Sequence, residues 1–246
     1  MKRFNVTGVC IPDKHYMVDL LEKVNTIVDE YICQGAYFTM NRARQFGKTT
    51  IINALEKRLC SEYIVISISL ESADDYFVNM QVFVNGLVID IAEELRRNGV
   101  HENIVSEWEQ KIESDYPLKM FGRKISLLCT QTNQKVILIM DEADKSSDNQ
   151  IFLSFLGMLR DKYLKREMGR DSTFHNVILS GVYDIKNLKS KMRPDEEKKY
   201  NSPWNIAVDF HVDMSFSAED IAGMLREYEA DHHTGMDIDH MSRLIY

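Results

Sequence analysis

The sequence predicts an α/β fold: a three-layer α/β/α core around a mainly parallel sheet of five strands. Three observations support this prediction. An apolar, aromatic run at 36–41 leads into a polar loop that ends in Gly-Lys-Thr at 47–49, where a helical pattern begins. A second apolar run, at 135–140, shows no polar alternation and stops at Asp-Glu, which is typical of a strand buried on both faces of a parallel sheet. Strand and helix patterns alternate around these two runs.

Before the second apolar run, most elements are helices. The pattern predicts a helix over 18–31 after a lead-in loop, a helix from 48 with the apolar stripe Ile51, Ile52, Leu55 and Leu59, a strand over 62–70, a helix over 72–97, a helix with Ile104, Trp108 and Ile112, and a helix after Pro117. Trp108 lies on an apolar stripe, so a core position is more plausible than a ligand platform.

After that run, strands and helices alternate again. The pattern predicts a helix carrying Phe152, Phe155 and Leu159, a short buried strand at 175–181, an alternating strand over 206–214, a helix capped by Ser217 and Asp220, and a last helix from 236. Residues 184–203 are charged and polar, which indicates a solvated loop; an arginine finger from Arg193 is the alternative. Because the last helix stops without a cap, we expect a core at 1–215 and the truncated start of a C-terminal lid at 216–246.

Composition narrows the class of protein. The 246 residues include 44% hydrophobic and 28% charged side chains, as in ordinary globular proteins. A formal charge of −8 does not support nucleic-acid binding over the whole surface, although a local basic patch is left open. We expect no membrane span, because no apolar run approaches the length of about 18 residues that one needs. The four cysteines are scattered singly, which predicts reduced thiols, mostly buried or structural, in a cytoplasmic protein.

The Gly-Lys-Thr loop has the parts of a phosphate-binding site. Backbone N–H groups at a helix N-terminus point at an anion, and the helix dipole adds positive charge there. Lys48 would reach the terminal phosphates and the Thr49 hydroxyl would ligate Mg²⁺. Arg42 stands where the first glycine of the usual pattern is expected. The alternative is a plain helix start, with Gly47 in a tight turn and Lys48 in solvent.

The second apolar run supplies carboxylates where a ligand of an open α/β sheet sits, at the carboxyl end of a strand. Asp141 would hold Mg²⁺ through water, and Glu142 would orient or deprotonate an attacking water. The alternative is that both acids cap the next helix. Ser180 ends the later buried strand, which we expect between the other two, and would sense the γ-phosphate; plain turn chemistry is the alternative. Tyr16 is a candidate for contact with the nucleotide base, or a core residue.

These motifs resemble those of the bacterial AAA-like-domain ATPases, a group close to the STAND and archaeal ATPases. Their variant phosphate loop reads Arg-Pro-Arg-x-x-Gly-Lys-[Ser/Thr], and this chain has Arg42-Ala43-Arg44-Gln45-Phe46-Gly47-Lys48-Thr49. Ile-Met-Asp-Glu-Ala-Asp at 139–144 is similar to their Walker B strand. Asn-Ser-Pro-Trp-Asn-Ile at 201–206 is similar to the segment before their last core strand. The resemblance runs from about residue 5 to the end.

The resemblance implies a P-loop core with ATP and Mg²⁺ as cofactors, followed by a small helical or winged-helix lid. It places the loop and its first helical turn around the triphosphate: Arg42, Ala43, Arg44, Gln45, Phe46, Gly47, Lys48, Thr49 and Thr50. Ala43 replaces the usual proline, and Arg42 and Arg44 would touch phosphates or close a neighbour's site. The sequence shows no identifiable lid arginine for the γ-phosphate.

The sequence therefore predicts a Mg-dependent ATPase that hydrolyses the β–γ bond of ATP and so drives a regulatory or assembly switch. Its catalytic residues would be Lys48, Glu142 and Ser180, with Thr49 and Asp141 as metal ligands. One alternative is a nucleotide-locked scaffold that binds ATP with negligible turnover. Another is a DNA-associated ATPase of a mobile-element or defence system. A homo-oligomer or a protein partner is left open.

Overall fold

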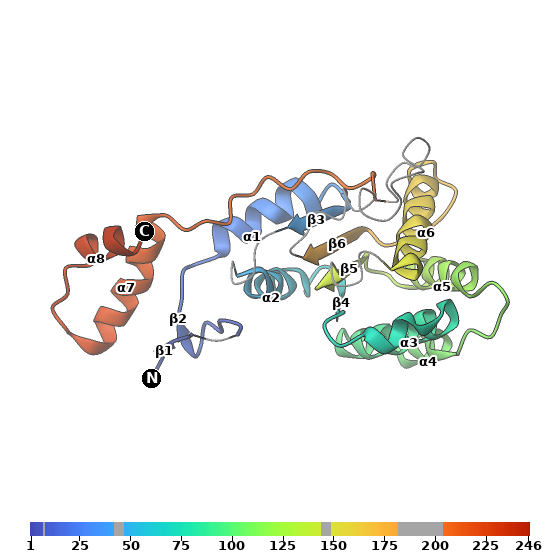
Figure 1. Ribbon diagram of the computed structural model, residues 1–246, viewed down its shortest axis with the longest axis horizontal. Helices are drawn as coiled ribbons and strands as arrows, with labels where there is room; N and C mark the ends of the chain where they lie inside the picture. The colour runs from blue at the N-terminus through green and yellow to red at the C-terminus, as the bar shows by residue number, and fades with distance from the viewer. Residues whose placement is uncertain (7, 42–46, 144–148, 182–203) are drawn as a thin grey trace. The chain divides into compact units, whose positions relative to one another are not determined.

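The structure contains a parallel sheet of four strands in the order β3-β6-β5-β4 (Figure 1). The strands are β3 (Phe38–Asn41), β4 (Ile64–Ser69), β5 (Val136–Asp141) and β6 (Asn176–Gly181). All residues of β5 and β6 are buried, as the apolar runs without alternation predict. The order also confirms that β6 lies between the strand before the Gly-Lys-Thr loop and the strand that ends in Asp-Glu.

The computed structural model describes residues 1–6, 8–41, 47–143, 149–181 and 204–246. These residues form two compact units. The sheet unit comprises Tyr31–Ala43 and Leu59–Phe210, and the helical unit comprises Met1–Glu30, Arg44–Arg58 and His211–Tyr246. The charged segment 184–203, with Arg193, lies outside the described residues, so its predicted role stays a prediction.

The fifth strand expected over 206–214 is reduced to one parallel bridge, between Phe38 and Val208. The amide of Val208 donates to the carbonyl of Tyr37 at 2.8 Å. The fully buried Trp204 fixes this segment beside β3, because its indole N–H donates to Thr39 Oγ1 at 3.0 Å. The bridge therefore stands at the β3 edge, where a fifth strand would add to the sheet.

Four helices of the sheet unit share one hydrophobic core with the sheet: α3 (Met80–Arg97), α4 (Glu102–Glu109), α5 (Pro117–Gln131) and α6 (Gln150–Glu167). Trp108 is in this core, as expected, and its indole N–H donates to the carbonyl of Val88. The helix predicted over 72–97 is interrupted: a 3₁₀ helix, η2, covers Asp74–Val78. Asn79 has an extended backbone, and its side chain caps α3 by accepting from the amide of Val82. Asparagine side chains often bond to nearby backbone groups in this way, which interrupts a helix instead of continuing it.

The outer edge of β4 is closed by side chains of α3. Asn98, which follows the last residue of α3, accepts from the amide of Val65 at 3.0 Å and donates to the carbonyl of the same residue at 2.8 Å. The Asn98 side chain thus satisfies both outward-pointing backbone groups of Val65, as a further strand would. The amide of Ser67 points at a carboxylate oxygen of Glu94 at 3.5 Å.

Arg166, near the end of α6, holds the segment just before the first residue of β6. Its guanidinium donates to the carbonyls of Phe174, His175 and Gly35 at 2.6–2.9 Å. Burial, followed by the charges of Lys135 and Arg166, lowers the pKa of His175 to about 4. His175 is therefore neutral near pH 7.

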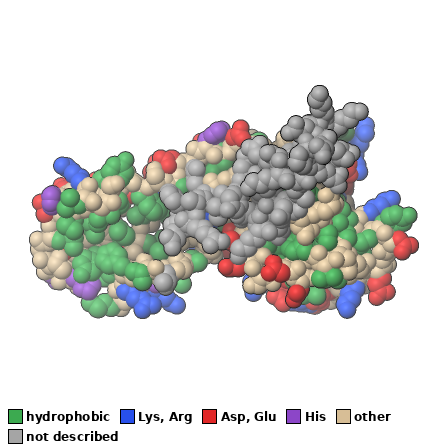
Figure 2. All heavy atoms as spheres, viewed as in Figure 1, with side chains coloured by type: hydrophobic (Ala, Val, Ile, Leu, Met, Phe, Trp, Pro, Cys, Tyr) green, Lys and Arg blue, Asp and Glu red, His purple; other side chains and the backbone are tan. Residues whose placement is uncertain are grey.

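The helical unit contains a short parallel pair, β1 (Arg3–Phe4) and β2 (His15–Tyr16), with the helices α1 (Leu21–Ile27), α2 (Lys48–Leu59), α7 (Ala218–His232) and α8 (Ile238–Ile245). A π-helical turn, η1 (Val28–Ile32), follows α1. The predicted capping box of Ser217 and Asp220 starts α7. Hydrophobic side chains are exposed on the surface of the α7–α8 pair (Figure 2).

The cysteines and the membrane prediction can be compared directly with the structure. All four cysteines are free thiols. None of the four is fully buried, because Cys33 and Cys60 are exposed and the other two are half-buried, so the burial alternative is wrong. Within the described ranges, no helix combines the length and the apolar character needed to cross a membrane.

Candidate functional site

Polar side chains meet at the carboxyl ends of the parallel strands of the sheet unit. Between β3 and β6, the register pairs Met40 with Ser180 and Asn41 with Gly181. Between β4 and β5, it pairs Ser69 with Asp141. The predicted sensor on β6 and the predicted metal ligand on β5 therefore end neighbouring strands at one edge. In open α/β sheets this edge is where ligands bind.

Asp141 is the last residue of β5, and it is only 8% exposed. Its Oδ1 accepts from the amide of the next residue, Glu142, at 2.9 Å. This short contact fixes the direction of the carboxylate at the strand end. A fixed carboxylate on a rigid strand is a suitable support for a hydrated Mg²⁺, which is usually bound by one or two protein oxygens together with phosphate oxygens and water.

Glu142 is one of two described non-glycine residues with positive φ, at 54°. This left-handed conformation is unfavourable for a residue with a β-carbon, and such strain is concentrated at functional sites. The chain turns at this residue. The Glu142 side chain is half-buried just after the end of β5, and Ala143 is buried in the hydrophobic core. The strain is a cost of holding the carboxylate at the strand end.

Ser180 is fully buried, and its hydroxyl has no hydrogen-bond partner among the described residues. Buried hydroxyls without a partner are uncommon and call for an explanation such as a ligand or a water. Asn41, which ends β3 and is paired in register with Gly181, was not predicted from the sequence as a site residue. The signal was similar to that for Ser180: a polar side chain at or next to the last position of a buried strand.

The Gly-Lys-Thr segment begins α2 in the helical unit. Gly47 has a φ of 71°, which favours glycine, and its carbonyl accepts from the amide of Ile51 at 2.9 Å. Lys48 is only 6% exposed, so the alternative that it simply extends into solvent is wrong. Thr49 is exposed. The first turn of α2 has no acidic residue and the last turn carries Lys57 and Arg58, so no carboxylate of α2 neutralises its positive N-terminus.

The remaining predicted ligands divide into two groups. The loop residues Arg42, Ala43, Arg44, Gln45 and Phe46 lie outside the described residues, and their contacts with phosphate stay predictions. Thr50 is described: its Oγ1 accepts from the amide of Cys10 at 3.3 Å, which ties the lead-in segment to the first turn of α2.

Tyr16 fits the core alternative that the sequence left open. Its ring packs against Phe4 and Tyr228, with centroids 5.3 Å away in both cases. Its hydroxyl donates to Asp231 at 2.7 Å and lies 3.2 Å from Nε2 of His232. The bond to Asp231, with burial, raises the pKa of Tyr16 to about 12. The side chain is thus engaged with α7, and contact with a nucleotide base remains a prediction only.

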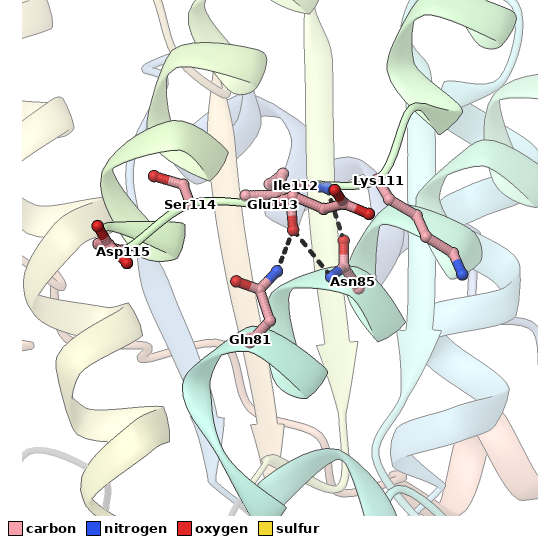
Figure 3. Close-up of a pocket in the computed structure, with 7 residues that line it drawn as sticks. All are labelled: Gln81, Asn85, Lys111, Ile112, Glu113, Ser114 and Asp115. Carbon is pink, nitrogen blue, oxygen red and sulfur yellow. Dashed lines mark hydrogen bonds between the residues drawn. The ribbon is translucent and has the colours of Figure 1, made fainter.

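A pocket of about 610 Å³ lies between α3 and the loop at 110–115 (Figure 3). None of the predicted site residues lines it. The side-chain amides of Gln81 and Asn85 both donate to the carbonyl of Ile112. The carbonyl oxygen of the Asn85 side chain also accepts from the backbone N–H of Ile112. These polar groups hold the loop on α3, so they do not form a ligand site.

The described residues fit ATP and Mg²⁺ in three respects. A helix begins with Lys48 and a hydroxyl and without a competing acid, a carboxylate is fixed at a strand end, and a buried hydroxyl lacks a partner. No group of three or more His, Cys, Asp or Glu side chains that could hold a metal occurs in the described part of the chain. A Mg²⁺ ion held by one carboxylate together with phosphate oxygens and water needs no such group.

Together, the parallel sheet, the strand order and the glycine-lysine-threonine helix start define a P-loop ATPase fold. A family model described as the AAA-like domain matches residues 12–245, and the chain belongs to this family. This confirms the resemblance and the fold class predicted from the sequence. No curated protein has a matching sequence.

Solved structures of archaeal origin-recognition proteins are similar in fold. The Aeropyrum pernix ORC2 protein in its ADPNP–ADP complexes aligns with a TM-score of 0.52 and 14% identity, over 97% of this chain and 58% of that one. Its ADP form gives a TM-score of 0.49 at 10% identity over the same shares. The Aeropyrum pernix ORC1 protein in complex with DNA gives 0.47 at 10% identity, over 87% of this chain and 50% of that one. The chain thus spans between 50% and 58% of the length of these proteins.

Proposed function

We propose that the chain is a Mg-dependent ATPase that hydrolyses the β–γ bond of ATP in the cytoplasm and uses this step as a regulatory or assembly switch. The buried, unpartnered hydroxyl of Ser180, at the same strand-end edge as Asp141, carries the proposal. Both the family and the nucleotide named for the ORC2 structure support it.

In this proposal each side chain has one role. Lys48 and the N–H groups of the phosphate loop hold the β- and γ-phosphate oxygens, and Thr49 with Asp141 holds Mg²⁺. Mg²⁺ supplies charge neutralisation on the phosphates. Glu142 orients the attacking water and accepts its proton, and Ser180 donates a hydrogen bond to the γ-phosphate or to that water.

A nucleotide-locked scaffold is the second candidate. We further propose that residues 216–246 begin a lid. That segment contains two arginines: Arg226 is ion-paired with Glu219 at 2.9 Å, and Arg243 is exposed on α8. An arginine already paired within its own helix is poorly suited to stabilise a γ-phosphate, so binding without appreciable turnover is consistent with this arrangement. We do not extend the proposal to DNA, because the net charge of −8 does not favour it.

Thermal unfolding with and without Mg-ATP tests the nucleotide site. Ligand at about 100 times its dissociation constant stabilises the folded state by about 2.7 kcal/mol, which corresponds to about 5–10 °C for a chain of this size. We expect this shift in the native chain and in Lys111→Ala, an exposed lysine of the 110–115 loop, and its loss in Lys48→Ala. Equal shifts in both variants, or no shift in the native chain, would contradict the proposed site.

Turnover separates the two candidates. Glu142→Gln should keep the thermal shift and lower the hydrolysis rate by about 10²–10⁴, whereas Glu113→Gln in the exposed loop should leave the rate unchanged. A native chain that shows the thermal shift without hydrolysis even in a single-turnover assay would favour the scaffold.

A further inference from the structure

The outward side of α5, in the sheet unit, carries exposed apolar and basic side chains. Tyr116, at the N-terminus of the helix, is 71% exposed, and Leu127 is 50% exposed. Lys119 and Arg123, which lie between them, are also exposed. The four positions follow one another at intervals of three or four residues, so they lie along one side of the helix, and we call them the α5 stripe. Lysine and arginine have apolar stems, so the stripe is a continuous surface with both apolar and basic character.

The charges of the α5 stripe have no counter-charge in the described part of the chain. The sequence of α5 contains no acidic residue, and no described carboxylate forms an ion pair with Lys119 or Arg123. The Arg123 guanidinium points at the sulfur of Met120 at 3.7 Å, and a thioether is only a weak acceptor. Since the formal charge of the whole chain is −8, an acidic molecule is repelled by most of it and attracted locally by this stripe.

Contacts with two neighbouring helices make α5 a rigid support for this surface. The ammonium group of Lys162, on α6, donates to the Ser126 hydroxyl at 2.6 Å. Toward α4, Lys124 donates to the backbone carbonyls of Glu107 and Trp108 at 3.0 and 2.8 Å. A helix that is already fixed loses little conformational entropy when a partner binds, which favours its use as a docking surface.

We propose that the α5 stripe binds an acidic amphipathic helix of another protein. From Tyr116 to Leu127 the stripe spans about 16 Å at about 1.5 Å per residue, so a partner element of about three helical turns covers it. A helix suits this surface better than a strand, because a helix satisfies its own backbone hydrogen bonds and a strand laid on side chains would not. The partner helix would place carboxylates opposite Lys119 and Arg123, and apolar side chains opposite the two ends of the stripe.

The side chains of the stripe set the expected strength. Tyrosine and arginine are enriched among the residues that carry most of the binding energy of interfaces, so Tyr116 and Arg123 should contribute most. Four side chains correspond to an interface below about 1,200 Å², which is typical of weak, reversible association. Binding should also weaken at higher salt, since exposed charges are screened beyond about 10 Å at 0.1 M ionic strength.

Fluorescence anisotropy with labelled helical peptides of about 15 residues, or about four turns, tests the contact. One peptide has leucine along one side flanked by glutamate, and the second has lysine in place of glutamate. Without nucleotide, so that the result is independent of the ATPase proposal, the native chain should bind the glutamate peptide at least about tenfold more tightly than the lysine peptide. Arg123→Glu and Tyr116→Ala should each weaken binding of the glutamate peptide by about tenfold. Their matched controls, Arg170→Glu at an exposed position after α6 and Met168→Ala at a position 62% exposed, should bind it as the native chain does.

Exchange of the charges tests the pairing itself. The double variant Lys119→Glu, Arg123→Glu should prefer the lysine peptide, a reversal that a misfolded chain would not show. A native chain that does not bind the glutamate peptide at about 1 mM would overturn the proposal. Affinity unchanged in both stripe variants would overturn it as well, and so would tighter binding of a short DNA duplex than of the glutamate peptide.

Discussion

The left-handed backbone at Glu142 makes an unusual prediction about stability. A φ of 54° costs a residue with a β-carbon about 1–2 kcal/mol, and glycine avoids that cost. Glu142→Gly and Glu142→Ala remove the same carboxylate, and they differ only in the β-carbon. We expect both variants to lack turnover and the glycine variant to be the more stable.

The magnitude follows from two opposing contributions. Relief of strain favours glycine by about 1–2 kcal/mol, while its greater freedom in the unfolded chain costs about 0.4–1 kcal/mol. The glycine variant should therefore be more stable than the alanine variant by about 0.5–1 kcal/mol. At Gly157 in α6, where φ is not positive and a β-carbon would meet open space, the order should be reversed, with Gly157→Ala gaining about 0.5–1 kcal/mol.

Urea unfolding followed by tryptophan fluorescence measures both comparisons. Trp108 and Trp204 are buried in the sheet unit, which also contains Glu142 and Gly157, so their emission follows the unfolding of that unit. The reasoning would be refuted if Glu142→Ala were at least as stable as Glu142→Gly while Gly157→Ala showed its usual gain. The backbone at 142 would then carry no strain.

Three further predictions use the same urea assay. Gly86→Ala should destabilise by about 1–3 kcal/mol, because its β-carbon would lie 2.7 Å from the ring of Tyr76; the penalty should shrink in a Tyr76→Ala background. Lys162→Ala should cost about 3 kcal/mol, since it leaves Asp171 without the buried ammonium group 2.7 Å away, and an equally stable variant would contradict this. The lowered pKa of His175 means that its contribution to stability is complete above about pH 6.5 and is lost as the pH falls toward about 4. His175→Gln should remove that part of the pH dependence of stability. An unchanged pH profile in the variant would show that His175 is not its source.

The sequence was most informative where burial alone decides the structure. The runs that became β5 and β6 have no polar alternation, and their ends in Asp141 and Ser180 could be placed at one edge of a parallel sheet from pattern alone. The capping box of α7 was equally readable, because a serine and an acid three residues apart satisfy each other locally.

Elements that depend on distant partners could not be predicted in the same way. The alternation over 206–214 agrees with the burial of Val212 and Met214 but not with Val208, which is 43% exposed. Alternation indicates which side of a chain is covered and not whether its backbone pairs. The break before α3 could not be predicted either, because it depends on one side chain, that of Asn79, which caps α3 inside an otherwise helical pattern. The spacing of apolar residues carries no information about such a cap. The engagement of Tyr16 with Asp231 joins positions more than 200 residues apart in the chain, so no local signal could reveal it.

The side-chain amide of Asn98 has a consequence for self-assembly. An open sheet edge is a template on which another chain can add a strand, and this is the usual route to aggregation. Since Asn98 occupies both outward-pointing backbone groups of Val65 and Glu94 faces the next amide, β4 offers an incoming strand little to bind. Asn98 and Glu94 together therefore make the β4 edge a poor template for amyloid-like growth.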